Sequence, residues 1–193
     1  VGKWLDTWSK EYLHSVKPRT VEAYEKNIRN YIVPALGSIQ LSALSAVDIQ
    51  KFYNTIVRNG YTVTRTVKGK KVTEQKTLSP KSIKNIHGTL HKALEKAVAL
   101  NYIKFNPADH PDLPRSEKRE IKPLDDAEIR KFLSAIRGHQ FETLYTVTLF
   151  TGMRQAEILG LSWDCVDFER GTILVKQQLQ RYGGADGTGA KYV

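Results

Sequence analysis

The residues best suited to chemistry lie in the segment Thr151–Trp163, which reads TGMRQAEILGLSW. In it, Arg154 follows an apolar helical run and a glycine, Gly152, and the carboxylate of Glu157 comes three residues later. Arginine is always charged and presents a planar fork of donors that matches phosphate oxygens. Because an unpaired buried charge is costly, an arginine among apolar neighbours must pair with Glu157 or receive an anionic ligand. The segment therefore indicates either a structural ion pair or a phosphate site.

The positive charge of the chain is confined to its first part. The net charge is +10, and residues 1–120 hold 21 Lys and Arg against 11 Asp and Glu, whereas residues 121–193 hold 9 of each kind. A basic globular module most often meets nucleic acid, because Lys and Arg neutralise phosphates. The plainer alternative is a solvated basic surface. Since the charge is segregated, a polyanion-binding first module is the favoured interpretation.

The composition excludes several other classes of protein. The hydrophobic content of 40% and the charged content of 26% are typical of a soluble globular protein. No apolar run approaches the roughly 18 residues of a membrane-spanning helix, and the first residues lack the pattern of a signal peptide. The single cysteine, Cys165, excludes an internal disulfide and a multi-cysteine zinc site, and 5 scattered histidines show no metal-ligand spacing. A cytoplasmic location without membrane contact is the simplest expectation.

Periodic apolar positions predict a helical first domain. The predicted helices cover residues 1–14, 20–32, 45–57 and 80–100. Ser45 and Asp48 form a capping box at the start of the third helix. Ser79 and Pro80 supply the N-cap and the first-turn proline of the fourth. Pro34 and Gly37 are expected to end the second helix, because proline breaks a helix interior and glycine commonly follows a helix end.

Two segments interrupt the helical pattern. In residues 61–78, valines alternate with threonines and basic side chains, which predicts a hairpin or mobile loop. In residues 105–123, prolines are mixed with basic residues, as in a connection between domains, and the charge imbalance also ends there. We therefore expect a core domain at 1–113 that contains the basic insertion, a linker at 114–122 and a second domain at 123–193.

The second domain is predicted to begin with helices and to continue with strands. The predicted elements are helices at 125–136, 140–151 and 154–159, a strand at 172–179 and a partner strand from Lys191. Asp125 and Glu128 form a second capping box, and Gly152 ends the middle helix. The side chain of Trp163 is expected in the core, and Cys165 is expected to be a buried, inert thiol.

The arginine segment resembles the first conserved box of the tyrosine recombinases, the phage-integrase family, whose pattern is T-G-x-R-x-x-E-hydrophobic-x-x-L-x-W. The surrounding order is also similar. The basic helical domain ends with a hydrophobic-x-x-N-P signal, Ile103-Lys104-Phe105-Asn106-Pro107, and the next helix starts with Leu124, Asp125 and Glu128. The basic insertion before the last helix of the first domain is similar to that of conjugative-transposon and temperate-phage integrases.

The resemblance implies a mainly α fold, in which a helical SAM-like core-DNA-binding domain precedes the start of an α+β catalytic domain with a small antiparallel β-hairpin. It implies a site-specific recombinase or integrase of a mobile element, which cleaves and rejoins duplex DNA through a 3′-phosphotyrosine intermediate. No metal or other cofactor is implied. The implied partners are duplex DNA at recombination core sites, further copies of the protein in a homo-tetramer on two DNA sites, and an excisionase-type accessory protein in a bacterial cytoplasm.

The resemblance also implies roles for individual residues. Arg154 would stabilise the scissile phosphate, Glu157 would support the arginine, and Lys191 is the candidate for the catalytic lysine. The family's His-x-x-Arg and nucleophilic tyrosine have no counterpart, because no histidine follows Arg154 and because Tyr182 and Tyr192 come too soon after the box. The resemblance thus predicts the N-terminal part of a recombinase, cut inside its catalytic domain and unable to cleave DNA alone.

Three basic patches are predicted to contact DNA. They are Lys17, Arg19 and Thr20 at a helix start, Arg65, Lys68, Lys70 and Lys71 in the insertion, and Ser79, Lys81, Lys84 and Asn85 at the start of the last helix of the first domain. Helix N-termini favour phosphate, and phosphate contacts position a protein while helix side chains in a groove read bases. Any one of these lysines is better explained as a solvated surface residue, whereas the three patches taken together favour contact with DNA.

Two other functions stay open on the sequence. A non-catalytic duplex-DNA-binding protein or regulator that retains the recombinase fold would have the same basic domain. An RNA-binding module is disfavoured, because there is no RNP-type aromatic signature and no Gly-x-x-Gly clamp in a suitable setting. A His-x-x-Arg and a late tyrosine in a longer polypeptide would distinguish the enzyme from the regulator.

Overall fold

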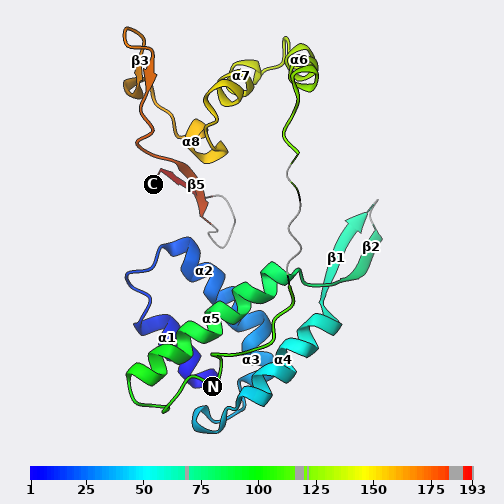
Figure 1. Ribbon diagram of the computed structural model, residues 1–193, viewed down its shortest axis with the longest axis vertical. Helices are drawn as coiled ribbons and strands as arrows, with labels where there is room; N and C mark the ends of the chain where they lie inside the picture. Colours follow the sequence, from blue (N-terminus) through cyan, green and yellow to red (C-terminus); the bar gives the residue numbers. More distant parts are fainter. Residues whose placement is uncertain (68–69, 116–119, 121, 183–188, 193) are drawn as a thin grey trace. The chain divides into compact units, whose positions relative to one another are not determined.

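The computed structural model divides into two compact units, Val1–Lys118 and Arg119–Val193. It describes residues 1–67, 70–115, 120, 122–182 and 189–192. The fold is mainly helical with small antiparallel two-stranded sheets, which confirms the predicted fold class (Figure 1). Within the described ranges, no helix is long and apolar enough to cross a membrane.

The first unit is assembled around its last helix. Its helical elements are α1 (Gly2–Glu11), α2 (Pro18–Asn27), the π-helical turn η1 (Ile28–Ile32), α3 (Val33–Leu36), the 3-10 turn η2 (Leu41–Ala43), α4 (Ala46–Asn59) and α5 (Pro80–Ala99). Helix α5 contacts α2, η1 and α4 (Figure 1). The apolar stripe predicted for this helix is therefore the surface on which the other helices pack.

The core of the first unit is formed by the apolar faces of α1, α4 and α5 and by the η1 turn. The largest fully buried side chains are Trp8, Tyr53, Leu5, Ile32, Ile49, Ile83, Ile86, Leu90, Leu94 and Thr89. Trp4, also buried, donates its indole N–H to the carbonyl of Ala93 at 2.9 Å. Because a buried indole needs a partner for its N–H, this bond fixes the position of α1 on α5.

Both predicted helix starts in the first unit are confirmed. The Ser45 hydroxyl accepts the Asp48 N–H at 3.2 Å, and the Asp48 carboxylate accepts the Ser45 N–H at 3.1 Å. The hydroxyl and backbone bonds from Ser45 lower the pKa of Asp48. At the start of α5, the Ser79 hydroxyl accepts the Ser82 N–H at 3.1 Å, and Pro80 follows it. These bonds satisfy N–H groups that the first helical turn leaves without partners.

The prediction that Pro34 and Gly37 end the second helix is confirmed for Gly37 and wrong for Pro34. The chain passes from α2 into η1 and α3, and the helix ends only before Gly37. At the junction, the Val33 N–H donates to the Ile28 carbonyl, five residues earlier. A proline inside an α-helix removes a hydrogen bond, and its ring clashes with the carbonyl four residues before it. The wider π turn just before Pro34 accommodates the ring, so the helix continues.

The basic insertion forms a hairpin, as one of the two sequence interpretations predicted. Strand β1 (Tyr61–Val67) pairs antiparallel with β2 (Lys70–Lys76), with Tyr61 opposite Lys76. Gly60 joins α4 to β1 with a φ of 60°, and a Cβ there would lie 2.1 Å from the carbonyl oxygen of Lys76. This corner therefore requires glycine.

The chain leaves the first unit along a segment that is attached to α4 and α5. The Asn106 amide donates to the His91 carbonyl at 3.2 Å and accepts the Ala108 N–H at 3.0 Å. Gln50 of α4 pairs with the backbone of Asp112, donating to its carbonyl at 3.1 Å and accepting its N–H at 2.9 Å. Side chains thus replace regular secondary structure in holding this segment.

The second unit combines short helices with small sheets. Its elements are α6 (Asp126–Ala135), α7 (Glu142–Thr151), α8 (Gln155–Leu159), the 3-10 turn η3 (Trp163–Cys165), β3 (Val166–Asp167), β4 (Thr172–Ile173), β5 (Leu179–Tyr182) and β6 (Gly189–Tyr192). The capping box of Asp125 and Glu128 opens α6, and Gly152 ends α7 in the left-handed conformation. Both features confirm the sequence prediction.

The predicted strand at 172–179 is wrong in its extent. Residues 172–173 pair with the short strand β3, residues 174–178 lie outside any strand, and Leu179 begins β5. The side chain of Gln177 instead donates from Nε2 to the carbonyl of Gly160 at 2.9 Å. Alternating apolar residues alone could not predict this, because β3 offers a partner for two residues only and the following segment packs against the end of α8.

Few side chains are buried in the second unit. Among its described residues, the buried hydrophobic side chains are Ile136, Met153 and Cys165. The side chain of Trp163 is 83% exposed and lies against that of Phe168, which is 78% exposed. The prediction that Trp163 belongs to the core is therefore wrong, because the described part of this unit has no layer that covers it. The Cys165 thiol is buried as predicted.

Replacing Asn106 with alanine should lower the free energy of unfolding of the first unit by about 1–3 kcal/mol. The reason is that the carbonyl of His91 and the N–H of Ala108 would lose their bonds to this side chain, and Ala108 is fully buried. The measurement is urea unfolding of the chain.

Unfolding of the first unit can be followed by the fluorescence of Trp4 and Trp8 in a Trp163→Phe background, because Trp163 is exposed and belongs to the other unit. The matched control is Asn30→Ala, which changes an exposed asparagine and should alter stability by no more than about 0.5 kcal/mol. Equal stability of the Asn106 and Asn30 variants would contradict the role of Asn106.

The stability of the first unit should fall as the pH drops below about 6.5, the ordinary pKa of histidine. Nδ1 of His87 lies 3.0 Å from the Tyr53 hydroxyl, and burial, followed by the charge of His91, lowers the pKa of His87. A lowered pKa means that the unfolded chain binds the proton more readily, so acid favours unfolding and the stability is fully present above pH 6.5 or so. Unfolding measured between about pH 5 and pH 8 should show a weaker pH dependence in His87→Gln; identical pH profiles would refute this assignment.

Candidate functional site

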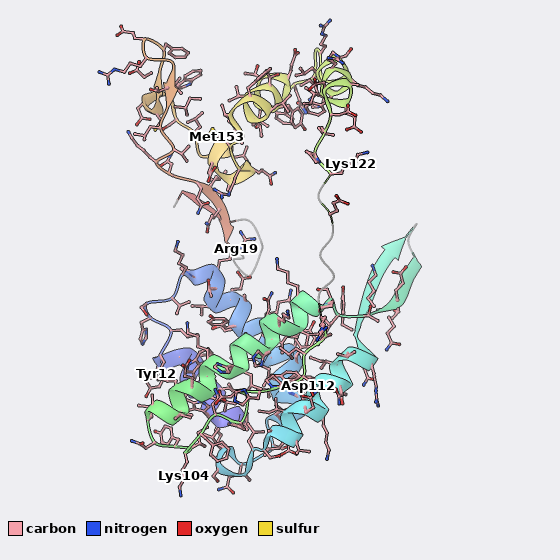
Figure 2. The ribbon with its side chains drawn as sticks, viewed as in Figure 1. Tyr12, Arg19, Lys104, Asp112, Lys122 and Met153 are labelled. Carbon is pink, nitrogen blue, oxygen red and sulfur yellow. The ribbon has the colours of Figure 1, made fainter. Side chains whose placement is uncertain are left out.

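Arg154 lies at a corner between α7 and α8. Gly152 ends α7 with φ 66° and ψ 14°, a conformation that side chains disfavour. Met153, which is buried, anchors the turn, and Figure 2 shows it between the two helices. Arg154 then has an extended backbone and forms the N-cap of α8. The turn at Gly152 and the buried side chain of Met153 thus determine the position of Arg154 at the start of α8.

Glu157 binds both the backbone and the side chain of Arg154. Its Oε2 accepts the Arg154 N–H at 2.9 Å, and its Oε1 accepts a hydrogen bond from Nη1 of the guanidinium at 2.9 Å. The backbone bond, followed by the side-chain bond, lowers the pKa of Glu157, so the carboxylate is ionised at neutral pH. The pairing predicted from the three-residue spacing is therefore present, and it holds the arginine at two points.

The guanidinium of Arg154 is open to solvent. The Arg154 side chain is 84% exposed, whereas that of Glu157 is only 19% exposed. The apolar surroundings expected from the sequence are not found, because Leu159 and Trp163 are themselves exposed. Exposed ion pairs contribute little to stability, so the main physical effect of this pair is to orient the guanidinium.

The hairpin of β5 and β6 follows a segment that packs against the end of α8. A Cβ at Gly160 would lie 2.9 Å from Cα of Gln178, so the glycine of the arginine segment permits this close approach. The bond from Gln177 to the Gly160 carbonyl holds the two segments together. Lys191 lies in β6 opposite Gln180 of β5, and its side chain is outside the described part of the chain.

The first predicted DNA patch lies at the start of α2. Lys17 is the N-cap residue, and no side-chain bond caps this helix start. Lys17 and Arg19 are exposed and Thr20 is half-buried. Figure 2 shows Arg19 at the N-terminal end of the helix. The three residues are therefore adjacent on one exposed helix start.

The second predicted patch lies in the β1–β2 hairpin. Arg65 belongs to β1, and Lys70 and Lys71 belong to β2. Lys68 lies outside the described residues. The backbone pairing brings these two basic stretches together, although they are separated along the sequence by the turn of the hairpin.

The third predicted patch lies on the first turns of α5. Lys81, Lys84 and Asn85 are exposed and follow one another at helical spacing, so they share a face. Ser79 differs from them, because its hydroxyl is used to cap the helix. Ser79 therefore contributes to this patch by fixing the start of α5.

An open hollow of about 710 Å³ lies between α2 and α5. Of the predicted DNA-contact residues, Ser79, Lys84 and Asn85 line it. Nδ2 of Asn27 lies 3.4 Å from the Asn85 carbonyl and 3.0 Å from the Thr89 hydroxyl, and it donates to both. Because the hollow is bounded by two helices joined through these bonds, its shape is set by the packing of the first unit.

The hollow also contains residues that the sequence analysis missed. Lys26 and Asn27 line it from α2. Arg19 and Lys26 are seven positions apart, which is about two helical turns, so they lie on the same face of α2. That spacing is the signal that could have identified Lys26, whereas the position of Asn27 depends on the distant helix α5.

Comparison with known proteins gives matches across both units. Residues 1–57 match the family model of the phage integrase N-terminal SAM-like domain. The chain is 30% identical over 189 residues to a XerC-like tyrosine recombinase of Caldanaerobacter subterraneus, covering 94% of this chain and 44% of that protein. It is 37% identical over 92 residues to the ICEBs1 integrase of Bacillus subtilis, covering 47% and 25%. The chain thus spans less than half the length of these relatives.

Solved structures show the same fold. A Tn1549 transposon integrase in complex with circular intermediate DNA has a TM-score of 0.78 at 24% identity, covering 99% of this chain and 57% of that chain. A lambda integrase tetramer bound to a Holliday junction has a TM-score of 0.65 at 19% identity, covering 92% and 46%. With the SAM-like model over residues 1–57 and a tyrosine recombinase match along nearly the whole sequence, the chain belongs to the tyrosine recombinase and phage integrase family.

Proposed function

We propose that the protein carrying this chain is a site-specific recombinase or integrase of a mobile element, which cleaves and rejoins duplex DNA through a 3′-phosphotyrosine intermediate. The observation that carries the proposal is the Arg154–Glu157 pair, in which two hydrogen bonds orient an exposed guanidinium. The positive first unit of the same chain supplies the affinity for DNA.

Arg154 is proposed to stabilise the charge that develops on the scissile phosphate. A donor fixed in advance at that position costs no reorganisation during the reaction. The guanidinium has five N–H groups, and its bond to Glu157 comes from Nη1, so donors are left for a two-point contact with phosphate oxygens. Glu157 acts here as a positioning residue.

Lys191 is proposed as the catalytic lysine. It lies in a hairpin that follows the segment packed on Gly160, at the end of the arginine box. An ammonium group brought to the same phosphate would add a second positive charge where negative charge develops. The support for this role is its position in the hairpin.

The first unit is proposed to hold duplex DNA through its three basic patches. Lys17, Arg19 and Thr20, together with the hairpin residues Arg65, Lys68, Lys70 and Lys71, would contact phosphates and set the position of the protein. Lys81, Lys84 and Asn85 would face a groove, where an asparagine can bind adenine through two hydrogen bonds. The Tn1549 integrase, which shares this fold, is bound to DNA.

The whole protein is proposed to act as a homo-tetramer on two DNA sites in a bacterial cytoplasm, with an excisionase-type accessory protein. The lambda integrase that shares this fold is a tetramer on a Holliday junction. The exposed side chains of Phe150, Trp163 and Phe168 support the view that further protein surface covers the second unit.

Binding of this chain to duplex DNA should weaken steeply as the salt concentration rises. Each phosphate neutralised by Lys or Arg releases counterions, which gives a slope of log affinity against log salt of about −0.9 per phosphate. Fluorescence anisotropy of a labelled duplex measures the slope. Lys81→Gln with Lys84→Gln should reduce its magnitude by about 2, whereas Lys104→Gln, outside the proposed DNA patches, should leave it unchanged. A salt-independent affinity would remove the basis for a DNA-binding first unit.

In the full-length protein, Arg154→Ala should reduce covalent cleavage of a suicide DNA substrate by about 100- to 1000-fold. Arg154→Lys should not restore the rate, because an ammonium cannot make the planar two-point contact. The matched control is Arg170→Ala, which removes another exposed arginine of the same unit, paired with Asp167 at 3.8 Å.

The Arg154→Ala and Arg154→Lys variants should bind the substrate as the unchanged protein does. Cleavage by Arg154→Ala at the unchanged rate would refute the proposed role. A full-length protein that binds DNA but forms no covalent adduct would instead support the alternative, a non-catalytic regulator with the recombinase fold.

A further inference from the structure

Gly88 lies near the middle of α5, where glycine destabilises a helix relative to alanine. Glycine is required in a helix when another group comes closer than a Cβ atom allows. Here a Cβ on residue 88 would meet no atom within 4 Å among the described residues. Gly88 is also not among the residues with positive φ. Neither packing within the first unit nor backbone conformation therefore requires glycine at this position.

Other glycines of the chain have such a requirement. Gly60 has a positive φ and would place a Cβ against the carbonyl of Lys76. Gly160 would place a Cβ 2.9 Å from Gln178. Gly88 differs from both because the space beside it is open. A group from outside the protein therefore has room to approach the helix there.

The position of Gly88 indicates what that group is. Residues 81, 85, 88 and 92 follow one another at steps of three or four, so they share one face of α5. Lys81, Asn85 and Lys92 are exposed on this face, and Lys84 is exposed beside it. The row ends at Glu95, about one turn after Lys92 and two turns after Gly88. Gly88 is therefore a gap in a row of cationic and amide side chains.

The same gap opens into the hollow between α2 and α5. Gly88 lines this hollow of about 710 Å³ together with Lys84 and Asn85 of α5 and with Lys26 and Asn27 of α2. The bonds of Asn27 to α5 hold the two walls together. The hollow thus has positive groups on both walls and, at Gly88, bare helix backbone.

We propose that Gly88 is the point of closest approach between α5 and DNA, where the sugar–phosphate backbone of a duplex packs directly on the helix. Lys84 and Lys92, one turn to either side along the helix, bind phosphates, and Lys26 does so from the facing helix. Any side chain at position 88 would hold the strand away from these cations. The proposal rests on the DNA-binding function proposed above. It adds that Gly88 determines how closely α5 approaches the DNA.

The test is the Gly88→Ala substitution, for which stability and DNA binding should change in opposite directions. Because alanine favours the helix and meets no neighbour, the melting temperature of the first unit should rise by about 2–6 °C. Because the methyl group separates the helix from the strand, affinity for duplex DNA should fall about tenfold, and further in Gly88→Leu. No charge is lost, so the salt dependence of binding should keep its slope.

The matched control is Thr55→Ala on α4, an exposed helical position that does not line the hollow. It should also raise the melting temperature, through helix propensity, and leave the DNA affinity unchanged. All measurements use the whole 193-residue chain and a labelled duplex.

The outcomes separate this inference from the function on which it rests. If the unchanged chain binds DNA in a salt-dependent way and Gly88→Ala binds equally well, the inference is overturned and the DNA-binding function stands. If Gly88→Ala lowers both the melting temperature and the affinity, the glycine has a role in the fold, and the inference is overturned as well. If the unchanged chain does not bind duplex DNA, the proposed function itself fails.

Discussion

The first unit depends on hydrogen bonds that other segments make to the backbone of α5. Trp4, Asn27 and Asn106 come from three different parts of the chain, and each donates to a carbonyl oxygen of this helix. A helical carbonyl has a second lone pair, so it can accept such a bond without losing its own helical partner. These directional bonds fix the positions of α1, α2 and the segment around Asn106 on α5. The cationic face of the helix is left exposed as a result.

In the second unit, contacts between residues close in the sequence hold Arg154 in position. Arg154 is not held by a core, since few described side chains of this unit are buried. It is held by its own neighbours along the chain, through the turn at Gly152, the anchor of Met153 and the two bonds from Glu157. Because all of these contacts are local, residues of the arginine segment alone orient the guanidinium.

Sequence reasoning succeeded where structure is determined by residues within about one helical turn of each other. The capping box at Ser45, the one at Asp125 and the pairing of Arg154 with Glu157 are of this kind. It failed where distant segments decide. The exposure of Trp163 depends on whether other parts of the chain pack nearby, and no local pattern records that.

The same division applies to the candidate DNA surface. The lysines of α5 could be predicted because helical spacing places them on one face, whereas Lys26 and Asn27 join them only through the packing of α2 on α5. Gly88 is a harder case, since a glycine in a helical pattern reads simply as a weaker helix former. A role for Gly88 can be inferred only from the structure, which shows that the space beside it is open. No contact within the described residues explains this glycine, and under the proposed function the DNA that packs on α5 explains it.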